Sequence, residues 1–382
     1  MSERNHTTRY ATPSQIYGIL QHQLQLLGEQ PDMAHQLPPV MLWGPPGVGK
    51  SSIIRDVCEK AGVGFIDIRL SQREPVDLRG LPVPDGDSVN WLISGEWPRD
   101  PESRGIILFD EITAADRSLQ VAAYELILDR RLGNLYSLPD GWLVVAAGNR
   151  AEDRAVAQTF SSALANRFCH LDVEADLDSW CQWAATKQLH PDIIGFVRFR
   201  PECFFNMNGN IEQGWPSPRS WTRVASILEH AGDSLNEDTL SLMIQGMVGS
   251  AAATEFLAFR RWSKELPDVP AMLRGECPVS IPERADQRFA FCSSLAHHLW
   301  KGPENRLQER LERFFAISGE LTSDFATLAL LDATAAEGDS KQEQRAMDVF
   351  CHPAFESWSK THGKVFNQHM EKALSQKVEK VA

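Results

Sequence analysis

The 382-residue sequence lacks the marks of several protein classes. Its seven cysteines are odd in number and form no Cys-x-x-Cys pair, so neither a disulfide framework nor a zinc ribbon is indicated. No window approaches the roughly 18 apolar residues of a membrane span. The polar start, MSERNHTTRYATPSQ, has no apolar signal core. We therefore expect a cytoplasmic protein with reduced thiols and no membrane partner.

The chain has fewer basic than acidic residues, and its formal net charge is −13. Because an acidic protein repels a polyanion, nucleic acid is an unlikely partner on these grounds. Hydrophobic residues make up 43% and charged residues 23% of the chain, which is typical of a folded protein. No internal repeat or low-complexity tract is present.

Short apolar runs alternate with helical patterns in the first part of the chain, and helical patterns alone follow. Strands are predicted at 39–43, 64–70, 105–111, 142–149 and 168–173. This alternation predicts an α/β fold: a parallel αβα sheet domain, an all-α lid and a helical C-terminal extension. The expected divisions are a flexible arm at 1–12, the αβα domain at 13–173, the lid at 174–270 and the extension at 271–382.

The stretch MLWGPPGVGKSS joins a predicted strand to a predicted helix through a glycine-rich turn. Glycines allow successive amide N–H groups to face one concavity that fits phosphate, and the helix N-terminus adds to it. The pattern matches a Walker A loop, in which lysine reaches the β- and γ-phosphates and serine holds magnesium. The predicted ATP-binding residues are Gly44, Pro45, Pro46, Gly47, Val48, Gly49, Lys50, Ser51 and Ser52.

Asp110 and Glu111 end an apolar run, which is the Walker B arrangement. Alone, such a pair could be a solvated strand end. A Walker A loop roughly 60 residues upstream favours the functional reading. Asp110 is then predicted to hold Mg²⁺ together with Ser51, and Glu111 to activate the attacking water.

Three further polar residues are catalytic candidates. Asn149 ends the predicted strand at 142–149, where an amide can contact the γ-phosphate and the water (sensor 1) or merely cap a turn. Arg167 ends a helix and could act on a neighbouring subunit's nucleotide, or be an ordinary helix-end arginine. Arg219 follows Ser217 and Pro218 at a helix start, as a sensor 2 candidate or a purely structural residue.

The chain resembles an AAA+ ATPase through five short motifs: GPPGVGKSS, LFDEI, GN, ANRF and SPR. The segment SQREPVDLRGLP and the long helical pattern after Walker B resemble the MoxR-like group. The resemblance covers about residues 12 to 266. It implies a hairpin-like insertion between Asp77 and Arg99, facing the pore of a ring, with Trp91 and Trp97 near its tip or base. The alternative is that both tryptophans are core anchors.

The chain departs from the family pattern at two positions. It has Asn149-Arg150 where Asn-Pro is common, and Asn166-Arg167 where Asp-Arg is common. The first change retains the asparagine, and the second removes a carboxylate that orients the arginine. In this group the lid is displaced, so Arg219 is placed to act either on its own nucleotide or across a subunit interface.

The resemblance implies a hexameric ring that couples ATP hydrolysis to remodelling of a protein client, with a von Willebrand factor A domain protein as partner. The alternative is a nucleotide-dependent switch or scaffold with little turnover. A nucleic-acid motor is disfavoured by the acidic charge. The extension at 271–382 is expected either to dock the partner or to pack against the lid. The pairs His297-His298 and Cys169-His170 lack two further ligands at metal spacing and are expected to be structural.

Overall fold

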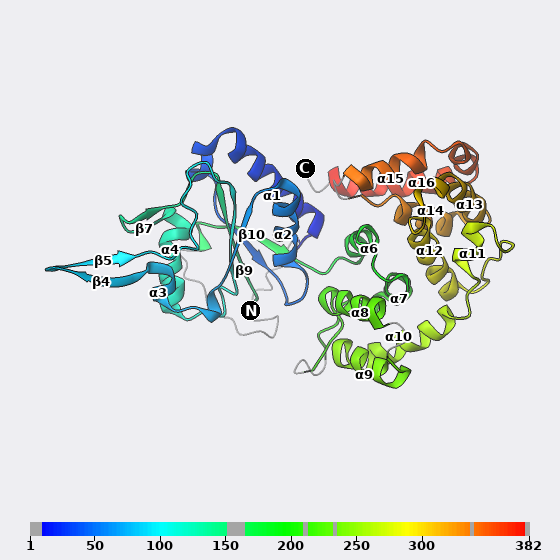
Figure 1. Cartoon of the computed structure of the whole chain (residues 1–382), viewed down its shortest axis with the longest axis horizontal. Helices are drawn as coiled ribbons and strands as arrows, with labels where there is room; N and C mark the ends of the chain where they lie inside the picture. Colours follow the sequence, from blue (N-terminus) through cyan, green and yellow to red (C-terminus); the bar gives the residue numbers. More distant parts are fainter. Residues whose placement is uncertain (1–9, 151–164, 209–212, 232–234, 337–339, 379–382) are drawn as a thin grey trace, which may run out of the picture. The chain divides into compact units, whose positions relative to one another are not determined.

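The computed structural model describes residues 10–150, 165–208, 213–231, 235–336 and 340–378. The chain divides into two compact units, Met1–Asp176 and Leu177–Ala382, which are described separately (Figure 1). The predicted fold class is confirmed, because a parallel αβα sheet is followed by helices. Most of the predicted arm, residues 1–9, lies outside the described residues. Within the described ranges, no helix has both the length and the apolar character needed to cross a bilayer.

A parallel sheet forms the centre of the first unit. In spatial order its strands are β1 (Tyr10–Ala11), β10 (Cys169–Val173), β2 (Val40–Trp43), β9 (Trp142–Gly148), β6 (Gly105–Asp110) and β3 (Gly64–Arg69). Every strand except β1 falls within a run predicted from the sequence. Because β2, β9 and β6 are neighbours and run in the same direction, the polar residues that follow them meet at one carboxyl edge.

Helices cover both faces of this sheet. They are α1 (Pro13–Glu29), α2 (Lys50–Ala61), α3 (Pro75–Arg79) and α4 (Arg117–Asp129). The helices α1 and α2 pack on one face, and α3 and α4 on the other (Figure 1). A capping box fixes the start of α1: Thr12 Oγ1 accepts from Gln15 N at 3.4 Å, and Gln15 Oε1 accepts from Thr12 N at 3.0 Å. These reciprocal bonds satisfy two donors that a helix start leaves unpaired.

Two antiparallel hairpins are inserted between the sheet strands. The first pairs β4 (Leu81–Asp85) with β5 (Ser88–Leu92) and extends away from the sheet, so the expected hairpin-like insertion is present (Figure 1). The second, β7 (Arg131–Leu132) with β8 (Tyr136–Ser137), was not predicted.

The two tryptophans of the insertion have different environments. Trp91 lies on β5 and is 41% exposed, whereas Trp97 is only 2% exposed. The ring of Trp97 packs 6.5 Å from that of Phe109 and 6.4 Å from that of Tyr136, measured between centroids. The core-anchor alternative is therefore correct for Trp97, while Trp91 belongs to the projecting hairpin.

The second unit is helical throughout its described part. Its α-helices are α6 (Leu177–Thr186), α7 (Pro191–Phe199), α8 (Pro218–Ala231), α9 (Glu237–Val248), α10 (Ser250–Ser263), α11 (Val269–Arg274), α12 (Ala285–Leu299), α13 (Leu307–Gly319), α14 (Ser323–Ala333), α15 (Ser340–Phe350) and α16 (Pro353–Val378). Short 3₁₀ helices in the two units are η1 (Pro31–His35), η2 (Leu70–Gln72), η4 (Pro201–Cys203) and η6 (Glu304–Arg306). One apolar cluster joins residues from α11 to α16.

A buried ion pair ties α7 to α14, across the expected division near residue 270. Arg198 donates to both carboxylate oxygens of Asp332, with Nη2 2.6 Å from Oδ1, and the two side chains are 11% and 2% exposed. Burial alone would lower the pKa of Arg198, but the charge of Asp332 and its hydrogen bonds, together with Cys181 and Asp178, raise it. Nearby, a Cβ on Gly195 of α7 would lie 2.9 Å from Ala290 Cα of α12. Helices from both sides of residue 270 are thus closely packed, which supports the lid-packing alternative for the extension.

Replacing Asp332 is expected to destabilise the second unit strongly. Asp332→Asn keeps the shape of the side chain but leaves the Arg198 guanidinium buried without a counter-charge, which costs about 3–5 kcal/mol. Urea unfolding followed by tryptophan fluorescence measures the change. Asp324→Asn, at an exposed position of the same helix, is the matched control. A free energy of unfolding equal for the two variants would contradict the importance of this pair.

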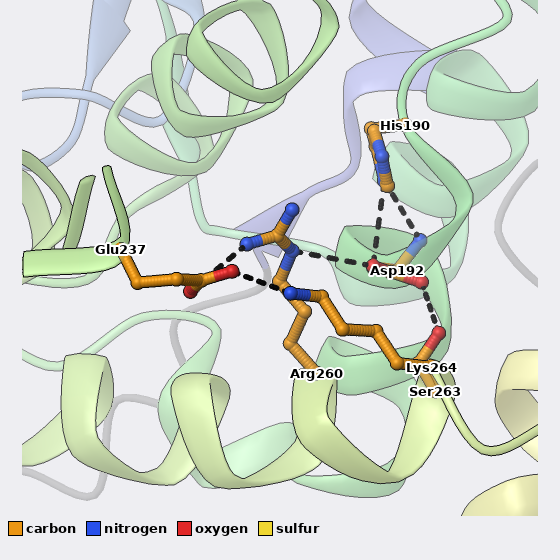
Figure 2. A network of polar contacts seen from close by, with 6 residues as sticks. All are labelled: His190, Asp192, Glu237, Arg260, Ser263 and Lys264. Atoms are coloured by element: carbon orange, nitrogen blue, oxygen red, sulfur yellow. Dashed lines mark hydrogen bonds and ion pairs between the residues drawn. The ribbon is translucent and has the colours of Figure 1, made fainter. Parts of the chain in front are cut away.

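A second polar network connects α7, α9 and α10 (Figure 2). Asp192 Oδ1 accepts from Ser263 Oγ at 2.5 Å, and its Oδ2 lies 3.7 Å from Arg260 Nε. Lys264 Nζ donates to Glu237, whose carboxylate also faces Arg260. At the start of α7, His190 Nδ1 accepts from Asp192 N at 3.3 Å. The network holds the ends of three helices together.

Candidate active site

The glycine-rich loop follows β2 and leads directly into α2. Gly47 and Gly49 have positive φ angles of 88° and 99°, which favour glycine. Gly44 is required for a different reason, because a Cβ there would lie 2.4 Å from Val173 O. The loop is also tied to β9, since Gly44 N donates to Gly148 O at 3.3 Å. The sequence that predicts a phosphate loop therefore forms a tightly fixed turn at the carboxyl edge of the sheet.

Lys50 and Asn149 meet at this edge, as predicted. Lys50 is 8% exposed, and its Nζ donates to Gly44 O at 2.5 Å, Pro45 O at 3.1 Å and Asn149 Oδ1 at 3.1 Å. Asn149 is itself fixed, because its backbone N donates to Thr113 Oγ1 at 3.1 Å. The ammonium group and the amide therefore lie together, where both can contact a phosphate bound by the loop.

The predicted magnesium ligands are also brought together. Ser51 Oγ, at the start of α2, donates to Asp110 Oδ2, at the end of β6, over 2.6 Å. A hydroxyl and a carboxylate are hard oxygen donors of the kind that Mg²⁺ prefers, usually alongside water and substrate phosphates. The donor set thus fits a magnesium ion. Such an ion would neutralise charge on the phosphates.

Glu111 directly follows Asp110, but the two carboxylates have different partners. Its φ angle is 57°, a left-handed conformation that is uncommon outside glycine, and its backbone N donates to Asp110 Oδ1 at 2.9 Å. Ser71 Oγ, in η2, donates to Glu111 Oε2. The turn separates the two carboxylates, so one can face Ser51, the predicted metal ligand, while the other stays available to orient water.

A third carboxylate, Asp67 on β3, lies close to this pair. Burial and the charge of Asp110 raise its pKa, although Arg69 and Arg55 act in the opposite sense. Its Oδ2 lies 3.7 Å from Arg55 Nη2 and 3.9 Å from Arg69 Nε. The two guanidinium groups partly offset the negative charge gathered at this edge.

The remaining loop residues surround these groups. Pro45 and Pro46 are partly exposed, Val48 is buried and Ser52 is exposed on α2. Arg167 lies just before β10 and is exposed. Its side chain is therefore accessible to a second chain, although its role stays a prediction.

Arg219 lies in the second unit, exposed near the start of α8. The predicted helix start is confirmed, since Ser220 N donates to Ser217 Oγ at 3.2 Å. Its role towards a nucleotide stays a prediction.

Sequence reasoning did not find Ser71 or Thr113. Ser71 lies 40 positions before Glu111, and Thr113 lies 36 positions before Asn149. Neither residue belongs to a short motif. Only the pairing of β3 with β6 and of β6 with β9 brings them to the site.

Lys50→Ala is expected to weaken ATP binding by about 10- to 100-fold, because one charge-assisted hydrogen bond contributes about 1.5–3 kcal/mol. Calorimetric titration with ATP measures the loss. Lys60→Ala is the matched control: Lys60 lies on the same helix but pairs with Asp56 at 2.7 Å, outside the loop. Equal ATP affinity of the two variants would exclude Lys50 from the phosphate site.

Comparison with known proteins agrees with this geometry for the first unit. Residues 40–171 match the ATPase family associated with various cellular activities (AAA). Midasin of Giardia intestinalis is 25% identical over 166 residues, which is 42% of this chain but 3% of that much longer protein. The match to the family shows an AAA ATPase domain within the first unit.

Two solved structures resemble the chain only in part. NtrX from Brucella abortus, in complex with ADP, is 16% identical with a TM-score of 0.34, covering 88% of this chain and 68% of that one. The RuvB Holliday junction branch migration motor of Thermotoga maritima is 15% identical with a TM-score of 0.35, covering 80% and 88%. TM-scores of this size do not extend the assignment beyond the AAA segment.

Proposed function

We propose that this chain is a MoxR-like AAA+ ATPase that hydrolyses ATP in an oligomeric ring and remodels or activates a partner protein. The observation that supports hydrolysis most strongly is the meeting of residues from three elements at one edge of the sheet. Lys50 and Ser51 begin α2, Asp110 ends β6 with Glu111 directly after it, and Asn149 follows β9. Phosphate, magnesium and water each have a matching group there.

In the proposed reaction, the loop amides and Lys50 hold the β- and γ-phosphates of ATP, and Ser51 and Asp110 hold magnesium. Glu111 accepts a proton from the attacking water, while Asn149 orients the γ-phosphate. Magnesium, when bound, would neutralise part of the negative charge of the phosphates. Separation of Glu111 from Asp110 by the left-handed turn supports this division of roles.

The proposal of a ring rests on the position and charge of Arg167. The residue is exposed, and a transition state that carries charge on the transferred phosphoryl group gains from an arginine supplied by another subunit. A hexamer is the assembly that the MoxR-like resemblance implies. Arg219 is proposed as a second cation from the helical unit.

The proposed contact with the partner is the β4–β5 hairpin. Apolar side chains that would ordinarily be buried are exposed on it: Leu81 by 58%, Val89 by 56%, Trp91 by 41% and Leu92 by 62%. Exposed apolar side chains gathered on one projecting element favour a protein-binding role. The partner that the MoxR-like resemblance implies carries a von Willebrand factor A domain.

The hairpin is tested by the ATPase rate with and without a purified von Willebrand factor A domain protein. Trp91→Ala is expected to reduce the ratio of stimulated to basal rate. Leu135→Ala, which removes another exposed apolar side chain outside the β4–β5 hairpin, is the control. If the unaltered protein were not stimulated, this partner would be wrong. If the two variants had the same ratio of stimulated to basal rate, the hairpin would not be the contact.

The alternative function is a nucleotide-dependent switch with little turnover. It predicts that ATP binds and remains intact for many minutes in the assembled protein. Multiple-turnover release of phosphate would exclude it.

A further inference from the structure

A cluster of side chains lies beside the glycine-rich loop, and no step of the proposed reaction uses it. Trp43 ends β2, directly before Gly44, and His170 lies on β10. The indole Nε1–H of Trp43 donates to His170 Nδ1 at 2.8 Å, and the two rings are stacked with centroids 6.0 Å apart. Pairing of β2 with β10 fixes the two backbones.

The hydrogen bonds determine the proton position on His170. An indole N–H can only donate, so His170 Nδ1 carries a lone pair and the remaining ring proton is on Nε2. That nitrogen lies 2.7 Å from Ala165 O and donates to it. A neutral imidazole thus links the residue before the loop to the backbone at Ala165.

Ala165 directly precedes the short turn that carries Arg167. The turn is anchored on its other side by Phe168, which is 7% exposed and packs into the core of the first unit. His170 also lies close to Phe168, with ring centroids 6.1 Å apart. The carbonyl of Ala165 and the ring of Phe168 therefore flank Arg167, and His170 contacts both.

The same cluster reaches the catalytic groups through Arg150, the residue after Asn149. The Arg150 guanidinium lies over the Trp43 ring, 5.2 Å from its centroid, and pairs with Asp172 on β10. Asn149 in turn accepts from Lys50. Contacts therefore run without a break from Lys50 and Asn149, through Arg150 and Trp43, to His170 and the turn of Arg167.

We propose that His170 is a positioning residue: it couples a subunit's own phosphate loop and Asn149 to the arginine that this subunit offers to the next one. The proposal rests on the proposed function of Arg167 as an arginine acting across a subunit interface. The proposal adds a structural link through which the nucleotide site of one subunit can affect hydrolysis in the next subunit. Movement of Trp43 or Arg150 with the loop changes the hydrogen bond to Ala165 and hence the presentation of Arg167.

Mixed assemblies test the proposal. In them, Glu111→Gln subunits keep Arg167 but have an inactive site, and Arg167→Ala subunits keep an intact site but offer no arginine. Hydrolysis then occurs only where a Glu111→Gln subunit supplies its Arg167 to the intact site of an Arg167→Ala subunit. His170→Phe keeps the ring stacking but removes both hydrogen bonds. Placed in the Glu111→Gln subunit, it is expected to reduce the mixed activity about tenfold or more, because small misplacements of a positioned group are costly.

The same substitution in the Arg167→Ala subunit is expected to have a clearly smaller effect, since that subunit has no arginine to position. Trp43→Phe, which removes the indole N–H but keeps an aromatic ring at this position, should show the same asymmetry. His22→Phe, at an exposed position of α1, is the matched control for a histidine exchange.

Equal losses in both subunits, or a loss in neither, would overturn the role of His170. Absence of activity in the mixture before any change at His170 would instead overturn the arginine function of Arg167, and the proposal with it. A merely structural role of His170 cannot produce a loss that depends on which subunit carries the change.

Discussion

Glu111→Gln is expected to bind ATP like the unaltered protein and to hydrolyse it about 10²- to 10⁴-fold more slowly, the usual contribution of a positioned general base. The substitution leaves in place the phosphate contacts proposed for Lys50 and the Ser51–Asp110 pair. It removes only the negative oxygen that accepts the proton of water. Calorimetric titration and single-turnover hydrolysis together separate binding from chemistry.

The control is Glu102→Gln, at an exposed position before β6. If Glu111→Gln hydrolysed ATP at the rate of this control, the assignment of the base would be wrong. If it lost ATP affinity as well as turnover, Glu111 would act in binding instead.

Arg167→Ala is the second large effect expected. It should bind ATP normally but lose about 10³-fold or more of the hydrolysis rate, because an arginine acting on the developing charge contributes 10³–10⁵-fold in related chemistry. Steady-state hydrolysis at saturating ATP measures the loss. Arg117→Ala, an exposed arginine at the start of α4, is the control.

The concentration dependence of the unaltered protein supplies a further check on Arg167. Because the arginine is proposed to come from another chain, hydrolysis per subunit should rise as assembly proceeds. Full activity in a monomer would contradict the composite site, whatever the effect of Arg167→Ala.

The parts of the site that could be predicted from the sequence are those encoded locally. A strand, a glycine turn and a helix start lie within about a dozen consecutive residues, and their geometry follows from glycine φ angles and helix capping. Asp110 and Glu111 were predicted because a buried strand leads directly to them. The structure places these groups together, with Ser51 bonded to Asp110 and Lys50 to Asn149.

The parts that could not be predicted depend on distant pairs. Trp43 and His170 are 127 positions apart; Trp43 is half-buried, His170 is exposed, and neither belongs to a short motif. Trp91 and Trp97 lie close together in the sequence, yet Trp91 is exposed on the β4–β5 hairpin and Trp97 lies in the core. Likewise, no local pattern indicates that Asp332 neutralises Arg198, so the packing of the extension on α7 required the structure.

The central claim is that ATP is hydrolysed at a site completed by a second copy of the chain. The most direct measurement is the ATPase rate of an equimolar mixture of Glu111→Gln and Arg167→Ala proteins. Each alone should be nearly inactive, and the mixture should recover a substantial part of the unaltered rate, because some interfaces then combine an intact Glu111 with a neighbouring Arg167. A mixture no more active than its two components would contradict the account.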